Sequence, residues 1–207
     1  MTTHPRERRA AQRPGDGPLS RRTFVRTAAA GALLIADEVQ SGMGRCGHFF
    51  AVQAFNVVPD IVTSAKALGG GIPCGAVLCS EETAGHFGAG ALGTTFGGGP
   101  IAAAAISATI DGILAEHLLV NVREREAKIR EQCVVGPVSK IQGMGLLLGL
   151  VCDRPATEGR DALLEHDILT GTSADPEVLR ILAPLVLQEG QVARLAEVLA
   201  SIAPATN

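Results

Sequence analysis

Residues 59–78 read PDIVTSAKALGGGIPCGAVL, and this stretch decides the fold class. It holds a short apolar run at 59–64 and most of a second at 75–80, with Lys66 and three consecutive glycines between them. Short apolar runs bounded by turn residues predict buried strands. A third run, GALLIADEVQ at 31–40, ends in acids, as strands do at the carboxyl end of a parallel sheet. The pattern therefore predicts an α/β unit with Lys66 just after a strand.

Further along the chain, helices and strands alternate. A glycine-rich loop at 94–100 precedes a helix from 101 to about 114, which is apolar nearly all round and is predicted to be buried on most faces. The remaining expected elements are a short helix and loop at 81–92, a charged helix at 117–133, strands at 146–152 and 178–182, and helices near 161–166 and 189–202. This order predicts a partial α/β unit followed by a small α+β unit.

Composition excludes several classes of protein. The chain has 207 residues, 46% hydrophobic and 19% charged, which is typical of a globular fold. No apolar run approaches the length of a membrane-spanning helix, so no membrane partner is predicted. Six Phe with no Tyr or Trp disfavour a module that stacks nucleic-acid bases. The body after residue 26 is acidic, so it predicts no nucleic-acid partner.

The five cysteines are irregularly spaced and form no C-x-x-C pair. This pattern predicts neither a metal site nor a disulfide framework. Partly buried thiols in a reducing compartment are the expected state, and they favour the cytoplasm.

Residues 1–30 form a basic leader, which we expect to be disordered because it is rich in Arg, Pro and Gly. The segment 20–26, SRRTFVR, resembles a twin-arginine export signal, so export by that route is the alternative to a cytoplasmic location. Against export, the following apolar stretch runs directly into Asp37 and Glu38 without a small-residue cleavage site.

Two residues suggest cofactor chemistry near the strand ends. Lys66 could be desolvated there, and a neutral amine is the nucleophile that Schiff-base chemistry needs. The alternative is an ordinary solvated surface lysine. Asp37 could hold the protonated ring nitrogen of a cofactor such as pyridoxal phosphate (PLP). The alternative is a strand-end acid that pairs with a basic side chain.

Two further residues suggest anion binding. Thr95, in a glycine-rich loop before a helix, suits a phosphate group, although the segment also fits an ordinary helix N-terminus with Pro100 near the first position. Arg180 lies inside the apolar segment VLRILAP at 178–184. Arginine suits bidentate carboxylate recognition, and the alternative is an edge-strand or interface ion pair.

Taken together, five segments resemble the class III (fold type I) PLP-dependent aminotransferases, in particular the acetylornithine/ornithine group. They are GALLIADEVQSGMGR, PDIVTSAKALGGGIPCGAVL, GTTFGGGP, KIQGMGLLLGL and VLRILAPL. The resemblance covers about residues 31–203 and corresponds to roughly the second half of a family member. It implies a partial PLP-binding large domain at 31–115 and a small C-terminal α+β domain at 116–207.

The resemblance implies a role for each candidate residue. Lys66 would bind PLP as a Schiff base and then move a proton between the substrate Cα and cofactor C4′. Asp37 would pair with the pyridinium nitrogen, and Gln40 would bind near the ring hydroxyl. Thr95 would bind the phosphate of the partner subunit's cofactor, which requires a homodimer. Arg180 would hold the substrate α-carboxylate.

The implied reaction transfers an amino group from a substrate such as N-acetylornithine to 2-oxoglutarate, in arginine biosynthesis. The chain departs from the family pattern at Gly99, where Asn is usual, and at Cys46, where Thr is common. The other phosphate-binding loop and the aromatic residue that stacks on the ring have no counterpart here.

These departures leave alternatives open. The chain could carry another class III reaction, that of an ornithine or ω-aminotransferase or a 2,1-aminomutase. It could also be a non-catalytic remnant or a half-subunit. In every case, a sheet reduced to three or four strands is expected to leave new edges and an uncovered apolar face.

Overall fold

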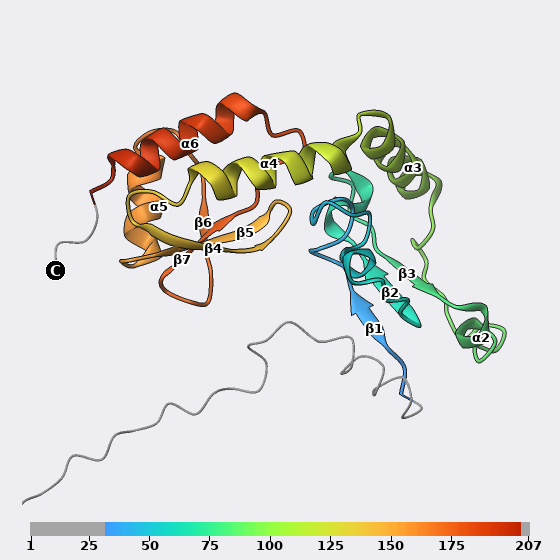
Figure 1. The fold of residues 1–207 in the computed structure, drawn as a ribbon. Helices are drawn as coiled ribbons and strands as arrows, with labels where there is room; N and C mark the ends of the chain where they lie inside the picture. The colour runs from blue at the N-terminus through green and yellow to red at the C-terminus, as the bar shows by residue number, and fades with distance from the viewer. Residues whose placement is uncertain (1–31, 204–207) are drawn as a thin grey trace, which may run out of the picture. The chain divides into compact units, whose positions relative to one another are not determined.

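The computed structural model describes residues 32–203, so the basic leader predicted at 1–30 lies outside the described residues. The chain divides into two units, Met1–Leu34 and Ile35–Asn207. All helices and strands below belong to the second unit (Figure 1).

The first sheet contains three strands: β1 (Ile35–Asp37), β2 (Ile61–Ser64) and β3 (Ala76–Cys79). Their order is β1-β2-β3; β1 pairs parallel with β2, and β3 pairs antiparallel with β2. The three predicted strands are confirmed, but the prediction of a buried strand over 31–40 was wrong in length and burial. Ile35 is 57% exposed, because among the described elements only β2 makes extensive contact with β1.

Two 3-10 helices and one short α-helix connect this part of the chain: η1 (Ala51–Phe55), η2 (Lys66–Gly69) and α2 (Glu81–Ala84). Helix α2 begins after Ser80, whose Oγ accepts a hydrogen bond from Thr83 N at 3.2 Å. This N-cap satisfies one of the donors that the first turn of a helix leaves free.

Helix α3 (Pro100–Ala115) forms where the sequence predicts it, but its burial differs from the prediction. Ile113 is its one buried residue, and Ile101 is 75% exposed. The helix packs on η2 and α4 along one side only. Its other faces stay uncovered because no other described element packs closely on them. The apolar sequence of α3 indicates which surface would be buried if another element covered it, but it does not show whether such an element is present.

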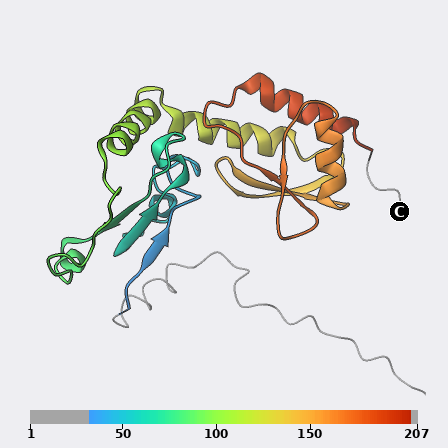
Figure 2. The same cartoon turned by 180° about the vertical axis from the view of Figure 1, so that it is seen from behind.

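The second sheet contains β4 (Val138–Met144), β5 (Leu147–Cys152), β6 (Gly171–Thr172) and β7 (Val178–Ile181), all antiparallel in the order β4-β5-β7-β6. Helices α4 (Leu118–Gln132) and α6 (Glu189–Ser201) lie side by side over one face of it (Figures 1 and 2). Helix α5 (Ala156–Leu164) packs near β6 and β7.

Strands β4 and β6 were not predicted. The residues of β4, VSKIQGM, do not alternate cleanly, because the register shifts between Val138 and Lys140. Strand β6 has only two residues and pairs solely with β7. Backbone pairing with a neighbour, rather than side-chain pattern, makes both segments strands.

The main hydrophobic core lies between the second sheet and its helices. Alternate residues of β5 point into it, as the burial pattern of that strand shows. Its fully buried members include Val122, Ile129, Leu146, Leu150, Leu163, Leu179 and Leu199. A smaller cluster of Met43, Leu68 and Ile113 holds the loops of the first sheet against α3. The core therefore anchors β7 firmly and the first sheet more lightly.

Within residues 32–203, no single helix is both long and apolar enough to cross a membrane. Helices α3 and α4 satisfy the criterion of length and composition only as a pair, with a 60° bend at the break between them.

The five cysteines are free thiols. The burial of two of them predicts that the stability of the fold depends on pH. Burial raises the pKa of Cys133, from 9.0, to about 11. Burial, reinforced by the nearby Glu38, raises the pKa of Cys46 to about 11 as well. The folded protein therefore holds these protons more tightly than the unfolded chain, so their contribution to stability is complete below about pH 9 and is lost as the pH rises through about 11.

We expect the free energy of unfolding in urea to fall over this pH window. In Cys133→Ala the free energy of unfolding should decrease less steeply with pH, because alanine has no proton to lose. Cys79→Ala, at an exposed thiol, is the matched control and should leave the slope unchanged. An equal slope in all three proteins would contradict the prediction.

Candidate functional site

Lys66 lies at the junction between β2 and η2. Its backbone is left-handed, with φ +51°, which is uncommon for a residue other than glycine and often occurs at functional sites. Its side chain is exposed. Gly70 follows with φ +58°, and a Cβ there would lie 2.8 Å from Thr109 Oγ1 of α3. The glycine turn thus lets the loop after Lys66 lie tightly on α3.

Asp37 ends β1 directly beside β2. Its Oδ1 accepts hydrogen bonds from Thr63 Oγ1 and from Val39 N, both at 3.1 Å. Parallel pairing of Asp37 with Thr63 places the carboxylate at the same sheet edge as the loop of Lys66. Within residues 32–203, no hydrogen bond to Oδ2 occurs, so this oxygen can accept one from a ligand.

Three of the predicted site residues line one cavity of about 390 Å³: Gln40, Lys66 and Arg180. They come from three separate segments of the chain. The other lining residues are Val39, Gly42, Arg45, Ala67 and Leu182. The volume is within the range of pockets that hold small molecules. Asp37 and Thr95 are not part of the lining.

Arg180 is exposed although it stands between two buried residues, Leu179 and Ile181. Side chains alternate along a strand, so its neighbours enter the core while Arg180 points the other way. Its guanidinium lies over Gly171 of β6, where a Cβ would be 3.3 Å from Nη2. Among the residues that the structure describes, it forms no ion pair, so the cation is free for an anionic ligand.

Thr95 lies in an exposed loop that does not reach the cavity of Lys66. The N-cap of α3 is Gly99, followed by Pro100, and no side chain caps the helix. This geometry matches the second of the two alternatives from the sequence, an ordinary helix N-terminus with Pro100 at its first position. The chain by itself therefore gives no contact between Thr95 and the other site residues.

Arg45 is a site residue that the sequence reasoning missed. Its Nη1 donates to Ala183 O and, at 3.4 Å, to Leu146 O, while Leu146 N donates to Arg45 O at 2.9 Å. Burial lowers the pKa of its guanidinium. Arg45 thus joins the loop that follows β1 to the segment directly after β7. Strand β7 itself carries Arg180. The only sequence signal was its place in the segment SGMGR.

Arg45→Met should lower the free energy of unfolding by about 2–3 kcal/mol, because two partly buried carbonyl groups lose a charged donor. Arg45→Lys should lose less, since the ammonium can still reach one carbonyl. Urea denaturation measures both, and Arg160→Met, at a half-exposed arginine of α5 that pairs with Asp161, is the control. A change of less than about 0.5 kcal/mol for Arg45→Met would contradict the role.

Glu38 is the second residue that the reasoning missed. It is buried, with Oε2 accepting from Ser41 Oγ at 2.5 Å and Oε1 from Val52 N at 2.8 Å. These bonds close the loop between β1 and η1, so Glu38 holds the wall of the cavity and does not face it.

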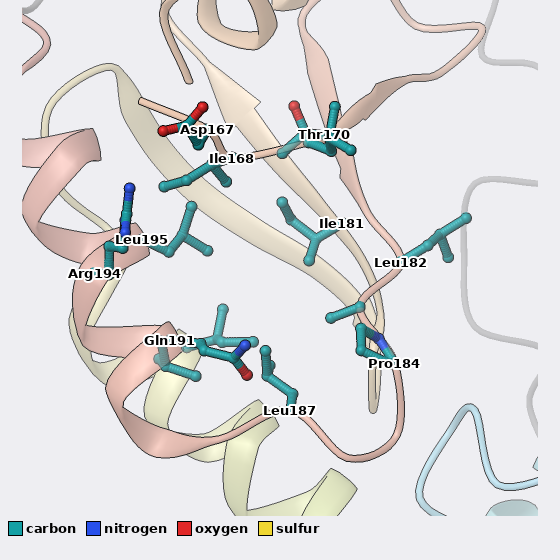
Figure 3. A pocket seen from close by; sticks show the side chains of 14 residues that line it. Asp167, Ile168, Thr170, Ile181, Leu182, Pro184, Leu187, Gln191, Arg194 and Leu195 are labelled. Atoms are coloured by element: carbon teal, nitrogen blue, oxygen red, sulfur yellow. The ribbon is translucent and has the colours of Figure 1, made fainter. Parts of the chain in front are cut away.

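A second, larger cavity of about 510 Å³ lies beside α6 and β7 (Figure 3). None of the predicted site residues lines it. Leu182 lines both cavities. Within the described part of the chain, no group of His, Cys, Asp or Glu has the arrangement of a metal site.

Residues 24–203 match the family described as aminotransferase class-III. The chain belongs to the class-III aminotransferase family. PLP is the cofactor of this family. The family and the fold class predicted from the sequence are thereby confirmed.

The curated relatives of this class-III chain include acetylornithine aminotransferases. That of Aquifex aeolicus is 42% identical over 170 residues, covering 82% of this chain and 44% of the relative. That of Streptomyces coelicolor is 44% identical over 171 residues, covering 80% and 42%. The chain thus spans somewhat less than half the length of these relatives.

Solved structures show the same fold. An acetylornithine aminotransferase from Elizabethkingia anophelis is 28% identical with a TM-score of 0.79, covering 86% of this chain and 49% of that one. An ornithine aminotransferase from Toxoplasma gondii is 25% identical with a TM-score of 0.80, covering 87% and 46%. That structure is described as having partial occupancy of PLP at its active site.

Proposed function

We propose that this chain contributes the lysine-bearing part of an acetylornithine aminotransferase, which transfers an amino group from N-acetylornithine to 2-oxoglutarate in arginine biosynthesis. The observation that carries the proposal is the shared cavity of Lys66, Gln40 and Arg180. An amine and a guanidinium in one cavity suit a substrate that must be held by its carboxylate while it reacts. The names of the relatives supply the choice of substrate.

Several observations support PLP binding by these residues, although Asp37 lies outside the lining of the cavity. The cavity has a suitable volume, and Lys66 and Gln40 both line it. Asp37 keeps one carboxylate oxygen fixed by Thr63 and Val39 and leaves the other available. A carboxylate held in this way suits a protonated ring nitrogen. Lys66 would hold the cofactor, Asp37 would pair with its ring nitrogen, and Gln40 would bind near its ring hydroxyl.

When bound, PLP supplies an electron sink that stabilises negative charge at the substrate Cα. The work of the chain itself is positioning and proton transfer. Arg180 would hold the α-carboxylate by two parallel hydrogen bonds, which fixes the direction of the Cα–H bond relative to Lys66. Lys66 Nζ would then move the proton between the substrate Cα and cofactor C4′. Arg45 would hold the two sides of the cavity in a fixed relative position.

The role of Thr95 requires a second subunit. We propose that its exposed loop reaches the phosphate of the partner subunit's cofactor in a homodimer, since the loop does not approach the cavity of its own chain. Light scattering of the purified protein tests this point: a monomeric mass at micromolar concentration would contradict it. A cytoplasmic location remains a prediction.

The test of function is an assay of glutamate formation from 2-oxoglutarate and N-acetylornithine, with ornithine as the competing donor. The expected result is a higher kcat/KM for N-acetylornithine. Arg180→Met should lower kcat/KM at least about tenfold, because a charged bidentate contact is lost. Arg160→Met, outside the cavity, is the control. Absence of turnover with both donors would contradict the proposed activity of this chain, and preference for ornithine would contradict the substrate.

A further inference from the structure

The larger cavity has the properties of a binding site that is separate from Lys66. Its volume of about 510 Å³ is within the range of small-molecule pockets. Most of its wall is apolar, with Ile181, Leu182, Leu187 and Leu195 among the side chains that line it (Figure 3). Leu169 also lines it and is 86% exposed. An apolar cavity with an exposed apolar side chain suits the apolar body of a ligand.

Two side chains of opposite charge, Asp167 and Arg194, line this cavity and lie on the same side of it in Figure 3. Arg194 donates from Nη2 to His166 O at 2.8 Å, which fixes the guanidinium and leaves its other donors free. Within residues 32–203 neither side chain forms an ion pair, with the other or with a third residue. Both charges are therefore available to a ligand.

Gln191 adds a neutral donor to the same wall. Its Oε1 accepts a hydrogen bond from Gln188 N at 2.9 Å, so the orientation of the amide is set by the start of α6. The bond uses the oxygen and leaves the amide nitrogen to donate. Arg194 and Gln191 come from successive turns of one helix and can act on the same anionic group.

We propose that this cavity binds an α-amino acid with a large apolar side chain. Arg194 and Gln191 donate to its carboxylate, Asp167 accepts from its ammonium group, and the apolar wall takes its side chain. A carboxylate without an amine would meet the uncompensated charge of Asp167, and an amine without a carboxylate would meet that of Arg194. The two opposite charges on one side of the cavity therefore select a zwitterion.

The experiment is isothermal titration calorimetry of the full chain without PLP, with L-phenylalanine as the probe. This measurement is independent of the proposed aminotransferase function, because it needs neither cofactor nor turnover. Three analogues each lack one group: 3-phenylpropionate, 2-phenylethylamine and glycine. Each should bind at least about tenfold more weakly than phenylalanine. Equal binding of 3-phenylpropionate would overturn the zwitterion, and no binding of phenylalanine would overturn the site.

Variants locate the binding. Arg194→Met and Asp167→Asn should each weaken phenylalanine binding about tenfold, and both should fold, since Arg194 is exposed and asparagine tolerates the left-handed backbone of residue 167. Arg160→Met is the matched surface control. Because Leu182 lines both cavities, Arg180→Met is tested as well. Binding that is lost in Arg180→Met and kept in Arg194→Met would place the ligand at Lys66 and overturn the proposal.

Discussion

Lys66→Ala is expected to abolish covalent attachment of PLP to this chain and to lower any transamination at least about a thousandfold, as loss of a catalytic nucleophile does. The physical reason is that Lys66 is the one lysine among the residues that line the cavity, and it lies directly after β2 with a left-handed backbone. The measurement is incubation with PLP, reduction with borohydride, and location of the phosphopyridoxyl group by peptide mass spectrometry. The wild-type chain should carry one group, at Lys66.

Two variants serve as controls for that experiment. Lys128→Ala, at a lysine of α4 that pairs with Glu131, should leave the labelling of Lys66 unchanged. Lys66→Arg keeps the positive charge but cannot form the covalent bond, so it should behave like Lys66→Ala. Labelling spread evenly over Lys66, Lys128 and Lys140 would mean that the cavity does not activate Lys66.

Gly143→Ala is expected to lower the free energy of unfolding by about 3–4 kcal/mol, combining left-handed strain with overpacking. Gly143 has φ +100°, and a Cβ there would lie 2.1 Å from Leu147 O in the β4–β5 hairpin. The backbone of β5 cannot yield, because Leu148 and Leu150 fix that strand in the core. Since domains are stable by only about 5–15 kcal/mol, much of the stability should be lost.

The matched control is Gly159→Ala in α5, where a Cβ would meet no atom within 4 Å. There alanine should stabilise by up to about 1 kcal/mol, because it restricts the unfolded chain and suits a helix. Urea denaturation with equal m-values measures both changes. A loss of less than about 1 kcal/mol for Gly143→Ala would show that the hairpin can relax.

Some of the candidate site could be predicted because its chemistry is local. Lys66 follows a strand and precedes three glycines, and Asp37 ends a strand, so residue order alone indicates both positions. Arg180 was noticed because a lone cation stands out in an apolar segment. The structure places Lys66, Gln40 and Arg180 at one cavity, but it leaves Asp37 outside the lining and Thr95 far along an exposed loop.

Other features could not be predicted because they depend on contacts between distant segments. Arg45 binds the carbonyl groups of Leu146 and Ala183, which are more than a hundred residues away. Strands β4 and β6 exist through their backbone partners, and the exposure of α3 reflects the neighbours that it lacks. The placement of Asp167 and Arg194 on one side of a cavity has the same origin.

By itself, the sequence determined the class-III aminotransferase motifs, the α/β and α+β order of elements, and the positions of Lys66, Asp37 and Arg180. These follow from short-range patterns of apolar, glycine and charged residues, which each segment carries within itself. Tertiary structure alone decided which of these residues share a cavity, that Arg45 joins its two sides, and that a second cavity presents two unpaired charges. Such features arise when packing brings together segments that are remote in the chain, and no local pattern encodes that proximity.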